Sequence, residues 1–335
     1  MTRSEIRYHI RNIYEERRLQ ATMREKAWQD AIFSRNPELE SMHQDLRALR
    51  YDVLLAQTQV EIDEEKLTLL ETTLQETEER YKTMLLHYKQ ENFHHCTTCE
   101  DRGRLTNGTS CPACYSQTLR TVLREMDARL LPPVDQNWEN FDLSIFSPDN
   151  LEVEGRPLSP RRQAEQYQKF MRNYVDHFPE DKRSFFFTGK TGTGKTYLAS
   201  AIVNALLDRG YLAFFLPVIT WEEELGRLRT LQRSFSADEE DIQRARNRYH
   251  LILDADFLVL DDFGMTTGAL ADPLSEIHFL LQERKSKDKP TLFTTNLRVH
   301  ELGKVYDERL LSRILERFVI LPFVGDDLRI RQRKT

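Results

Sequence analysis

The chain has 335 residues, of which 39% are hydrophobic, enough for one ordinary core but too little for two large ones, so we expect one globular domain joined to a more polar region. No stretch approaches the roughly eighteen consecutive apolar residues of a membrane span, and residues 1–8 lack the pattern of a signal peptide, which predicts a cytoplasmic protein. The net charge of -6 excludes a protein-wide positive field, so any nucleic-acid contact must use a local basic patch.

Residues 1–92 have the composition of long helices, with no glycine, one proline and many Glu, Arg, Gln and Leu residues. Asn36-Pro37 interrupts them, because Asn is a good N-cap and Pro is tolerated in the first helical turn. We expect one helix to end near Arg35 and a second to begin near Pro37.

The second helix carries a heptad pattern that Asp63 and Thr77 interrupt. Its apolar positions are Leu46, Leu49, Val53, Ala56, Val60, Leu67, Leu70, Leu74, Tyr81, Met84 and Tyr88. We predict an antiparallel hairpin of this helix with residues 4–35, and an intermolecular coiled coil is the alternative. Residues 1–92 are therefore assigned to a helical hairpin or coiled coil.

All four cysteines of the chain lie close together, as CxxC, eleven residues and a second CxxC. Two such pairs place four thiolates around a tetrahedral Zn²⁺, and a four-cysteine shell is closed, hence structural. Metal-free reduced cysteines and an iron–sulfur cluster are the alternatives. We assign residues 93–128 to a zinc-binding module whose ligands are Cys96, Cys99, Cys111 and Cys114.

Residues 129–162 are rich in Pro, Asp, Asn and Ser and are predicted to be a linker. Apolar side chains at intervals are expected to dock it on the next domain. They are Trp138, Phe141, Leu143, Ile145 and Phe146.

Residues 163–335 alternate short apolar runs with helix-length polar segments. Buried parallel strands with crossover helices explain this pattern, so we predict an α/β domain. The predicted strands are Phe185–Phe187, Leu212–Leu216, Phe257–Leu260, Thr291–Thr294 and Val319–Leu321.

A glycine-rich motif follows the first of these strands and opens an apolar helix at 198–207. It is Gly189-Lys190-Thr191-Gly192-Thr193-Gly194-Lys195-Thr196, a complete GxxxxGK[ST] pattern. Glycines allow such a loop to wrap phosphates with backbone N–H groups, and the helix N-terminus adds partial positive charge. We predict an ATP site in which Lys195 reaches the β- and γ-phosphates and the Thr196 hydroxyl binds Mg²⁺.

Two further strands end in polar residues. Asp261 and Asp262 follow 257–260 as in a Walker B element, with Asp261 expected to hold the Mg²⁺ shell and Asp262 to polarise the attacking water. Asn296 follows Thr291-Leu-Phe-Thr-Thr and is expected to hydrogen-bond the γ-phosphate or that water. Acids that cap a turn and an asparagine in a turn are the alternatives.

One arginine and one group of arginines are candidates for other contacts. Arg313, on a predicted helix, is a candidate to stabilise a neighbouring subunit's transition state, with a solvated helical face as the alternative. Arginines alternating with aromatic residues suit single-stranded nucleic acid, again with a solvated face as the alternative. These are Arg227, Arg229, Arg233, Arg244, Arg246 and Arg248, with Trp221, Phe235 and Tyr249.

Four segments in order resemble the AAA+ ATPases of the DnaC/DnaI and IstB group, relatives of the initiator DnaA. They are GKTGTGKT at 189–196, FLVLDDFG at 257–264, TLFTTN at 291–296 and RLLSRIL at 309–315. Trp138-Glu-Asn-Phe-Asp-Leu is similar to a short element that precedes this ATPase core. The resemblance implies an AAA+ fold, a P-loop and parallel sheet flanked by helices, with a short or absent lid.

The same resemblance implies roles for particular residues. Asn296 takes the sensor 1 role and Arg313 becomes the arginine finger, whereas a sensor 2 role for Arg329 stays open. The helices within residues 218–249 correspond to the element that contacts single-stranded DNA.

The charged helices followed by Cys96-Thr-Thr-Cys99-Glu-Asp101-Arg-Gly103 resemble bacterial or phage loaders of the replicative helicase. The resemblance implies an N-terminal region that binds a DnaB-type helicase, and an ATPase that self-associates into a ring or spiral on single-stranded DNA. It also implies that ATP hydrolysis governs helicase release, at the nucleoid in the cytoplasm. An IstB-type ATPase that assists a transposase, and a non-enzymatic adaptor, are the alternatives.

Overall fold

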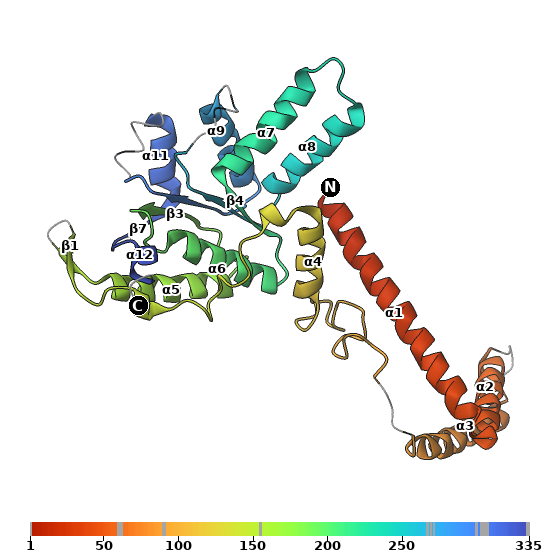
Figure 1. The fold of residues 1–335 in the computed structure, drawn as a ribbon. Helices are drawn as coiled ribbons and strands as arrows, with labels where there is room; N and C mark the ends of the chain where they lie inside the picture. The colour runs from red at the N-terminus through yellow and green to blue at the C-terminus, as the bar shows by residue number, and fades with distance from the viewer. Residues whose placement is uncertain are drawn as a thin grey trace. The chain divides into compact units, whose positions relative to one another are not determined.

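The computed structural model describes residues 2–58, 63–88, 92–153, 156–265, 268, 270, 272–298, 301 and 308–332. It divides into two compact units, Arg11–Thr109, here called the helical unit, and Met1–Ile10 with Ser110–Thr335, here called the sheet unit. Within the described ranges, no helix is both long and apolar enough to cross a membrane. Figure 1 traces the chain and labels its elements.

The helical unit contains most of α1 (Arg3–Phe33), together with α2 (Pro37–Gln57) and α3 (Glu64–Leu85). The Asn36 side chain accepts a hydrogen bond from the Leu39 N–H at 3.2 Å, and Pro37 occupies the first turn of α2. This N-cap confirms the predicted break between the first two helices.

The heptad pattern predicted one continuous second helix. This prediction is wrong, because the segment forms two helices and α2 ends before α3 begins. Asp63, which interrupts the pattern, is the N-cap of α3 and accepts a hydrogen bond from the Lys66 N–H at 3.1 Å. An acid that satisfies a free N–H favours a new helix start over helix continuation. As a result, α2 packs on α3, whereas the predicted partner was residues 4–35. Val60 of the predicted pattern lies outside the described residues.

The sheet unit is built on five strands, β3 (Ser184–Gly189), β4 (Ala213–Pro217), β5 (Phe257–Asp261), β6 (Thr291–Thr295) and β7 (Phe318–Phe323). Their order is β4-β5-β6-β3-β7, and every neighbouring pair is parallel. The five predicted strands and the α/β class are therefore confirmed. Since the strands are parallel, the carboxyl ends of β3, β5 and β6 share one edge of the sheet, where ligands bind in folds of this type.

Helices cover both faces of this sheet (Figure 1). On one face lie α5 (Pro160–Asp176) and α6 (Lys195–Asp208), and on the other lie α7 (Val218–Arg233), α9 (Pro273–Ser286) and α11 (Glu308–Arg317). Such double coverage explains why the strands are apolar on both sides. Helix α8 (Glu239–Leu253) packs on α7, and the short α12 (Leu328–Gln332) follows β7.

Between the cysteines and α5, the chain forms α4 (Tyr115–Asp127), the 3₁₀ turns η1 (Ala128–Leu130) and η2 (Leu143–Ile145), and the antiparallel pair β1 (Leu151–Val153) and β2 (Arg156–Leu158). Phe146 is buried and stacks on Phe141 with ring centroids 5.7 Å apart. Phe141 also meets the Tyr197 ring of α6 at 5.4 Å. Aromatic contacts thus hold this segment against α6.

Candidate functional site

The glycine-rich loop connects β3 to α6 at the carboxyl edge of the sheet. Gly189 has φ +143°, and a Cβ there would lie 2.2 Å from the Phe323 carbonyl oxygen, so only glycine fits. Gly194 has φ +93° and forms the N-cap of α6. Helix α6 therefore begins where the glycine-rich loop ends, and a helix N-terminus placed in this way binds phosphate groups.

Lys195 of this loop is buried, with 4% of its surface exposed. Its Nζ donates hydrogen bonds to the carbonyl oxygens of Gly189 and Lys190, both at 2.7 Å, and to Asn296 Oδ1 at 3.0 Å. Burial lowers the pKa of the ammonium group to about 8, although the carboxylates of Asp262 and Asp261 act in the opposite direction. Lys195 is thus a fixed cation held by three oxygen acceptors.

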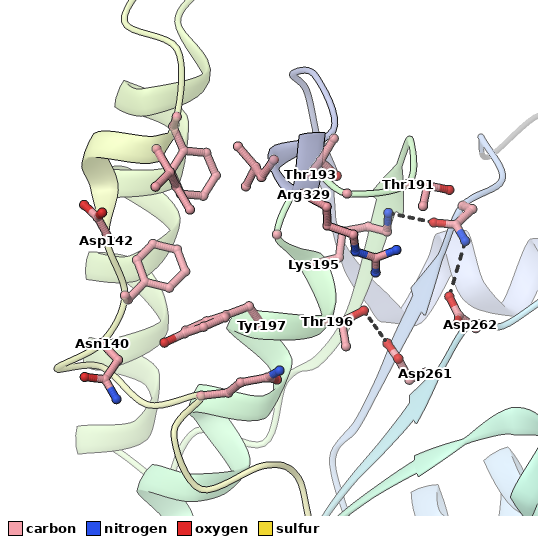
Figure 2. Close-up of a pocket in the computed structure, with 18 residues that line it drawn as sticks. Asn140, Asp142, Thr191, Thr193, Lys195, Thr196, Tyr197, Asp261, Asp262 and Arg329 are labelled. Atoms are coloured by element: carbon pink, nitrogen blue, oxygen red, sulfur yellow. Dashed lines mark hydrogen bonds between the residues drawn. The ribbon is translucent and has the colours of Figure 1, made fainter. Parts of the chain in front are cut away.

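Asp261 ends β5 and lies beside the first turn of α6. Its Oδ1 accepts a hydrogen bond from the Thr196 hydroxyl at 3.1 Å (Figure 2). The same oxygen accepts a second hydrogen bond from the Thr294 hydroxyl. Burial raises the pKa of this carboxyl group, and the neighbouring Asp262 adds to that effect. Hydroxyl and carboxylate oxygens are the hard ligands that Mg²⁺ prefers, so the two side chains fit a shared magnesium ion.

Asp262 comes directly after β5, and Asn296 comes directly after the neighbouring strand β6. Asn296 Nδ2 donates to Asp262 Oδ1 at 3.3 Å while its Oδ1 accepts from Lys195, which forms a continuous hydrogen-bonded chain. Asp262 has φ +56°, in the left-handed region that non-glycine residues rarely occupy. Such strained positions cluster at functional sites. The structure brings the predicted lysine, acids and asparagine together.

These groups line one cavity of about 430 Å³. Its phosphate-side wall consists of residues 191–197 with Asp261, Asp262 and Asn296. The opposite wall comes from the segment between α4 and α5, and Figure 2 shows Asn140 and Asp142 across the cavity from the two aspartates. That wall is formed by Gln136, Asn140, Phe141, Asp142, Ile145 and Phe146. Leu328 and Arg329, at the start of α12, line the cavity beside the glycine-rich loop, where the Leu328 N–H donates to the Gly192 carbonyl oxygen at 3.0 Å.

The residues of the opposite wall were missed as site residues by the sequence reasoning. The similarity of residues 138–143 to an element preceding the ATPase core was the available signal, but it assigned no contact. Phe141, Ile145 and Phe146 give this wall an apolar surface that suits a flat heterocyclic base. Arg329, whose role stayed open, lines the cavity.

Arg313, the predicted arginine finger, is absent from the lining of this cavity. It lies on α11, where its Nη1 is 3.0 Å from His278 Nδ1 of α9. It lines a separate hollow of about 460 Å³ with Arg183, Lys285 and Arg317. Its position is therefore outside the site of its own subunit.

The four predicted metal ligands cluster as expected. The sulfur atoms of Cys96, Cys99, Cys111 and Cys114 all lie within 4.8 Å of one another and all four residues are buried. Tetrahedral zinc with Zn–S bonds of about 2.3 Å separates its sulfur ligands by about 3.8 Å. The donor set fits one structural zinc ion.

Asp101 organises the first cysteine pair. This fully buried residue accepts hydrogen bonds from the Cys96 N–H at 2.9 Å and from the His95 N–H at 2.8 Å. The Gly103 N–H donates to Cys99 Sγ at 3.3 Å, a contact that stabilises a thiolate. These bonds give a physical reason for the acid and glycine that follow the first CxxC.

The structure corrects part of the predicted nucleic-acid patch on α7 and α8. Trp221 is fully buried and Tyr249 is 5% exposed, so neither ring can stack on a base. Their helical positions face the core. Phe235, in contrast, is fully exposed between α7 and α8.

Several of the predicted arginines are held in ion pairs. Arg248 contacts Glu224 at 2.7 Å and also pairs with Asp127 at the end of α4. Arg229 binds Glu276 of α9 at 2.9 Å. These contacts tie Arg248 and Arg229 to neighbouring helices, whereas Arg227, Arg233 and Arg244 remain exposed.

A family model and several known proteins match part of this chain. Residues 163–335, more than half of the chain, match the family model described as IstB-like ATP binding protein. The replicative helicase loader DnaC of Escherichia coli strain K12 is 32% identical over 143 residues, covering 43% of this chain and 54% of that protein. The insertion sequence IS5376 putative ATP-binding protein of Geobacillus stearothermophilus is 27% identical over 164 residues, covering 47% of this chain and 59% of that protein. The chain thus spans about half the length of the curated relatives it matches.

Two solved structures resemble the fold. A crystal structure of DnaI covers 56% of this chain and 94% of that chain, with 22% identity and a TM-score of 0.38. A crystal structure of the DnaC helicase loader covers 56% of this chain and 98% of that chain, with 24% identity and a TM-score of 0.40. Because the family match extends over the glycine-rich loop, both aspartates and Asn296, the chain belongs to the IstB-like ATP-binding proteins, a family of AAA+ ATPases.

Proposed function

We propose that this protein is an ATP-driven loader that binds a DnaB-type replicative helicase and delivers it onto single-stranded DNA, in the cytoplasm at the nucleoid. The observation that carries the proposal is that Lys195, Asp261, Asp262 and Asn296 line one cavity, in a chain that also carries a four-cysteine module. The curated relatives named as helicase loaders support the same function.

The cavity places the groups that bind the nucleotide and position the attacking water. Lys195 neutralises the β- and γ-phosphates, and the Thr196 hydroxyl and Asp261 carboxylate hold Mg²⁺, which supplies charge for phosphoryl transfer. Asp262 accepts a proton from the attacking water or polarises it. Asn296, bound to both Lys195 and Asp262, orients that water against the γ-phosphate. The apolar wall at Phe141 and Phe146 holds the base.

The site is completed by a neighbouring subunit. Arg313 lies outside its own cavity, and a guanidinium delivered in trans stabilises the charge on the equatorial oxygens of the transferred phosphoryl group. Hydrolysis therefore requires self-association into a ring or spiral on the helicase, and loss of the γ-phosphate loosens that assembly and releases the helicase.

The remaining parts of the chain bind the partners. The helical unit exposes large apolar side chains at Tyr51, Leu54, Leu55 and Leu69, which suit contact with the helicase. Phe235 and Arg233 at the tip of the α7–α8 hairpin are exposed and suit base stacking and phosphate contact on single-stranded DNA. The four cysteines hold Zn²⁺ as a structural ion.

A second candidate function is assistance of a transposase on duplex DNA. It is favoured by the family match and by the relative named after an insertion sequence. Affinity for duplex DNA in filament-like assemblies, without affinity for a helicase, would distinguish it from the loader.

A loading assay on circular DNA tests the loader function. Circular single-stranded DNA has no end to thread, so a closed helicase ring requires a loader to enter it. We expect the full chain to increase the amount of the host's replicative helicase bound to the circle, measured by gel filtration of the DNA complex. A forked linear DNA with a free single-stranded end is the control, because the helicase threads onto it unaided. Equal helicase binding to the circle with and without the protein would contradict the loader function.

A further inference from the structure

Asn204 connects three segments that are distant in sequence. It lies on α6, the helix that starts with Lys195, and is 2% exposed. Its Nδ2 donates to the carbonyl oxygens of Pro133 and Gln136, both at 2.9 Å, and its Oδ1 accepts from Arg120 Nη1 of α4 at 2.8 Å. Both amide protons of this buried side chain and its carbonyl oxygen are therefore in use.

The segment that Asn204 holds leads directly into the cavity. Gln136 lines the cavity, and Asn140 and Phe141 follow a few residues later. A second side chain of α6 strengthens the attachment, because the Tyr197 hydroxyl lies 3.2 Å from the Asp135 carbonyl oxygen. Two side chains of α6 thus fix the backbone at the start of the opposite wall of the cavity.

Helix α4 supplies the other end of the connection. Arg120 also donates to the Asn204 carbonyl oxygen at 2.7 Å and to Asp208 at 2.7 Å, so one guanidinium binds two successive turns of α6. Helix α4 begins directly after the metal ligand Cys114, which is its N-cap residue. The same helix therefore starts at the four-cysteine cluster and binds Asn204 one to two turns later.

We propose that Asn204 is a positioning residue for the nucleotide, and that it makes ATP affinity depend on α4 and hence on metal binding at the four cysteines. This inference rests on the proposed ATP site. An apolar residue at 204 would remove the two N–H donors that tie the carbonyl oxygens of Pro133 and Gln136 to α6. Those carbonyl groups are then free to move away from α6. The wall that carries Phe141 moves with them.

Two substitutions test the connection from its two sides. Asn204→Asp keeps the acceptor for Arg120 but removes both donors to the segment, whereas Arg120→Gln weakens the contact with α4 and leaves those donors in place. Arg124→Gln, an exposed arginine one turn along the same helix, is the matched control. The readouts are the Kd for a fluorescent ATP analogue and the separate KM and kcat of the full-length protein, with Tm and bound zinc measured for every variant.

We expect Asn204→Asp and Arg120→Gln to weaken nucleotide binding by about tenfold and fivefold, the range of a typical coupling between sites, and to raise KM with little change in kcat. Arg124→Gln should match the wild type. A purely structural role would lower Tm without this split between KM and kcat. Binding within twofold of the wild type in both variants, or a lower kcat at unchanged KM, would overturn the proposal.

Removal of the metal tests the same connection from the cysteine cluster. Metal analysis of the wild type should give about one zinc per chain, and Cys96→Ser/Cys99→Ser should lose it and bind the analogue more weakly. A zinc-free variant that binds as tightly as the wild type would contradict the dependence on metal. Lys195→Ala in the same assay separates the two proposals. If the wild type itself binds no nucleotide, the ATP site is wrong, whereas normal binding by Asn204→Asp beside lost binding by Lys195→Ala refutes only the positioning role.

Discussion

Lys195→Ala is expected to lower ATP turnover by about 100-fold or more and to weaken nucleotide binding, because the proposed ATP site uses its ammonium group as the fixed cation that neutralises the phosphates. The buried Nζ is held by three oxygen acceptors, so no neighbouring lysine can replace it without rebuilding the loop. Phosphate release at saturating ATP and titration with a fluorescent ATP analogue measure the two effects.

The control for this substitution is Lys169→Ala, which removes an exposed lysine from α5 on the same unit. It should leave both measurements unchanged. Turnover and binding by the Lys195→Ala protein within about threefold of the wild type, a change too small for a lost phosphate contact, would show that the cavity is not the ATP site.

Arg313→Ala is expected to abolish hydrolysis while ATP binding stays within about twofold of the wild type. An arginine supplied in trans contributes about 10³–10⁵ in rate by stabilising the transition state, and it contributes less to the ground state. Arg317→Ala, one turn further along α11, is the matched control and should retain turnover. Loss of both binding and hydrolysis would contradict a role in trans.

Mixing two inactive proteins tests the trans arrangement directly. In a mixed ring, an intact Lys195 site of an Arg313→Ala subunit can face the intact Arg313 of a Lys195→Ala subunit. We therefore expect ATP turnover to reappear when the two variants are combined, with a maximum near equal amounts. Zero turnover at every ratio, with mixed assembly demonstrated by mass, would place the arginine finger elsewhere.

The sheet and the phosphate side of the cavity could be predicted because each has a strong local signal. Strands buried on both faces are continuous apolar runs, and the functional residues follow those runs directly, as Asp261 follows β5. The parallel order then brings Asp261, Asn296 and Lys195 to one edge without any further information.

The opposite wall of the cavity could not be predicted because its position depends on tertiary contacts. The segment around Gln136 has no periodic pattern, and its place is set by hydrogen bonds to Asn204 and Tyr197 of α6. The break before α3 was missed for a different reason. Asp63 interrupts a heptad weakly, but as an N-cap it favours a new helix, and the pattern alone does not distinguish the two roles.

The burial of Trp221 and Tyr249 was also missed, although a local signal existed. Each lies on the same helical face as other apolar residues, Leu225 and Leu228 for Trp221 and Ile252 and Leu253 for Tyr249, and all are buried. The predicted nucleic-acid patch rested on aromatic residues that alternate with arginines, and it did not take this helical periodicity into account. The exposed Phe235 lies between the two helices, outside this periodic pattern.

Native mass spectrometry of the full chain mixed with the host's replicative helicase, with and without ATP, tests the loader function most directly. The loader function predicts a discrete complex of the helicase hexamer with several copies of this chain, and the mass gives their number. An intact helicase hexamer without bound copies in both conditions, for a chain that still binds ATP, would contradict it and favour the transposase-assisting ATPase.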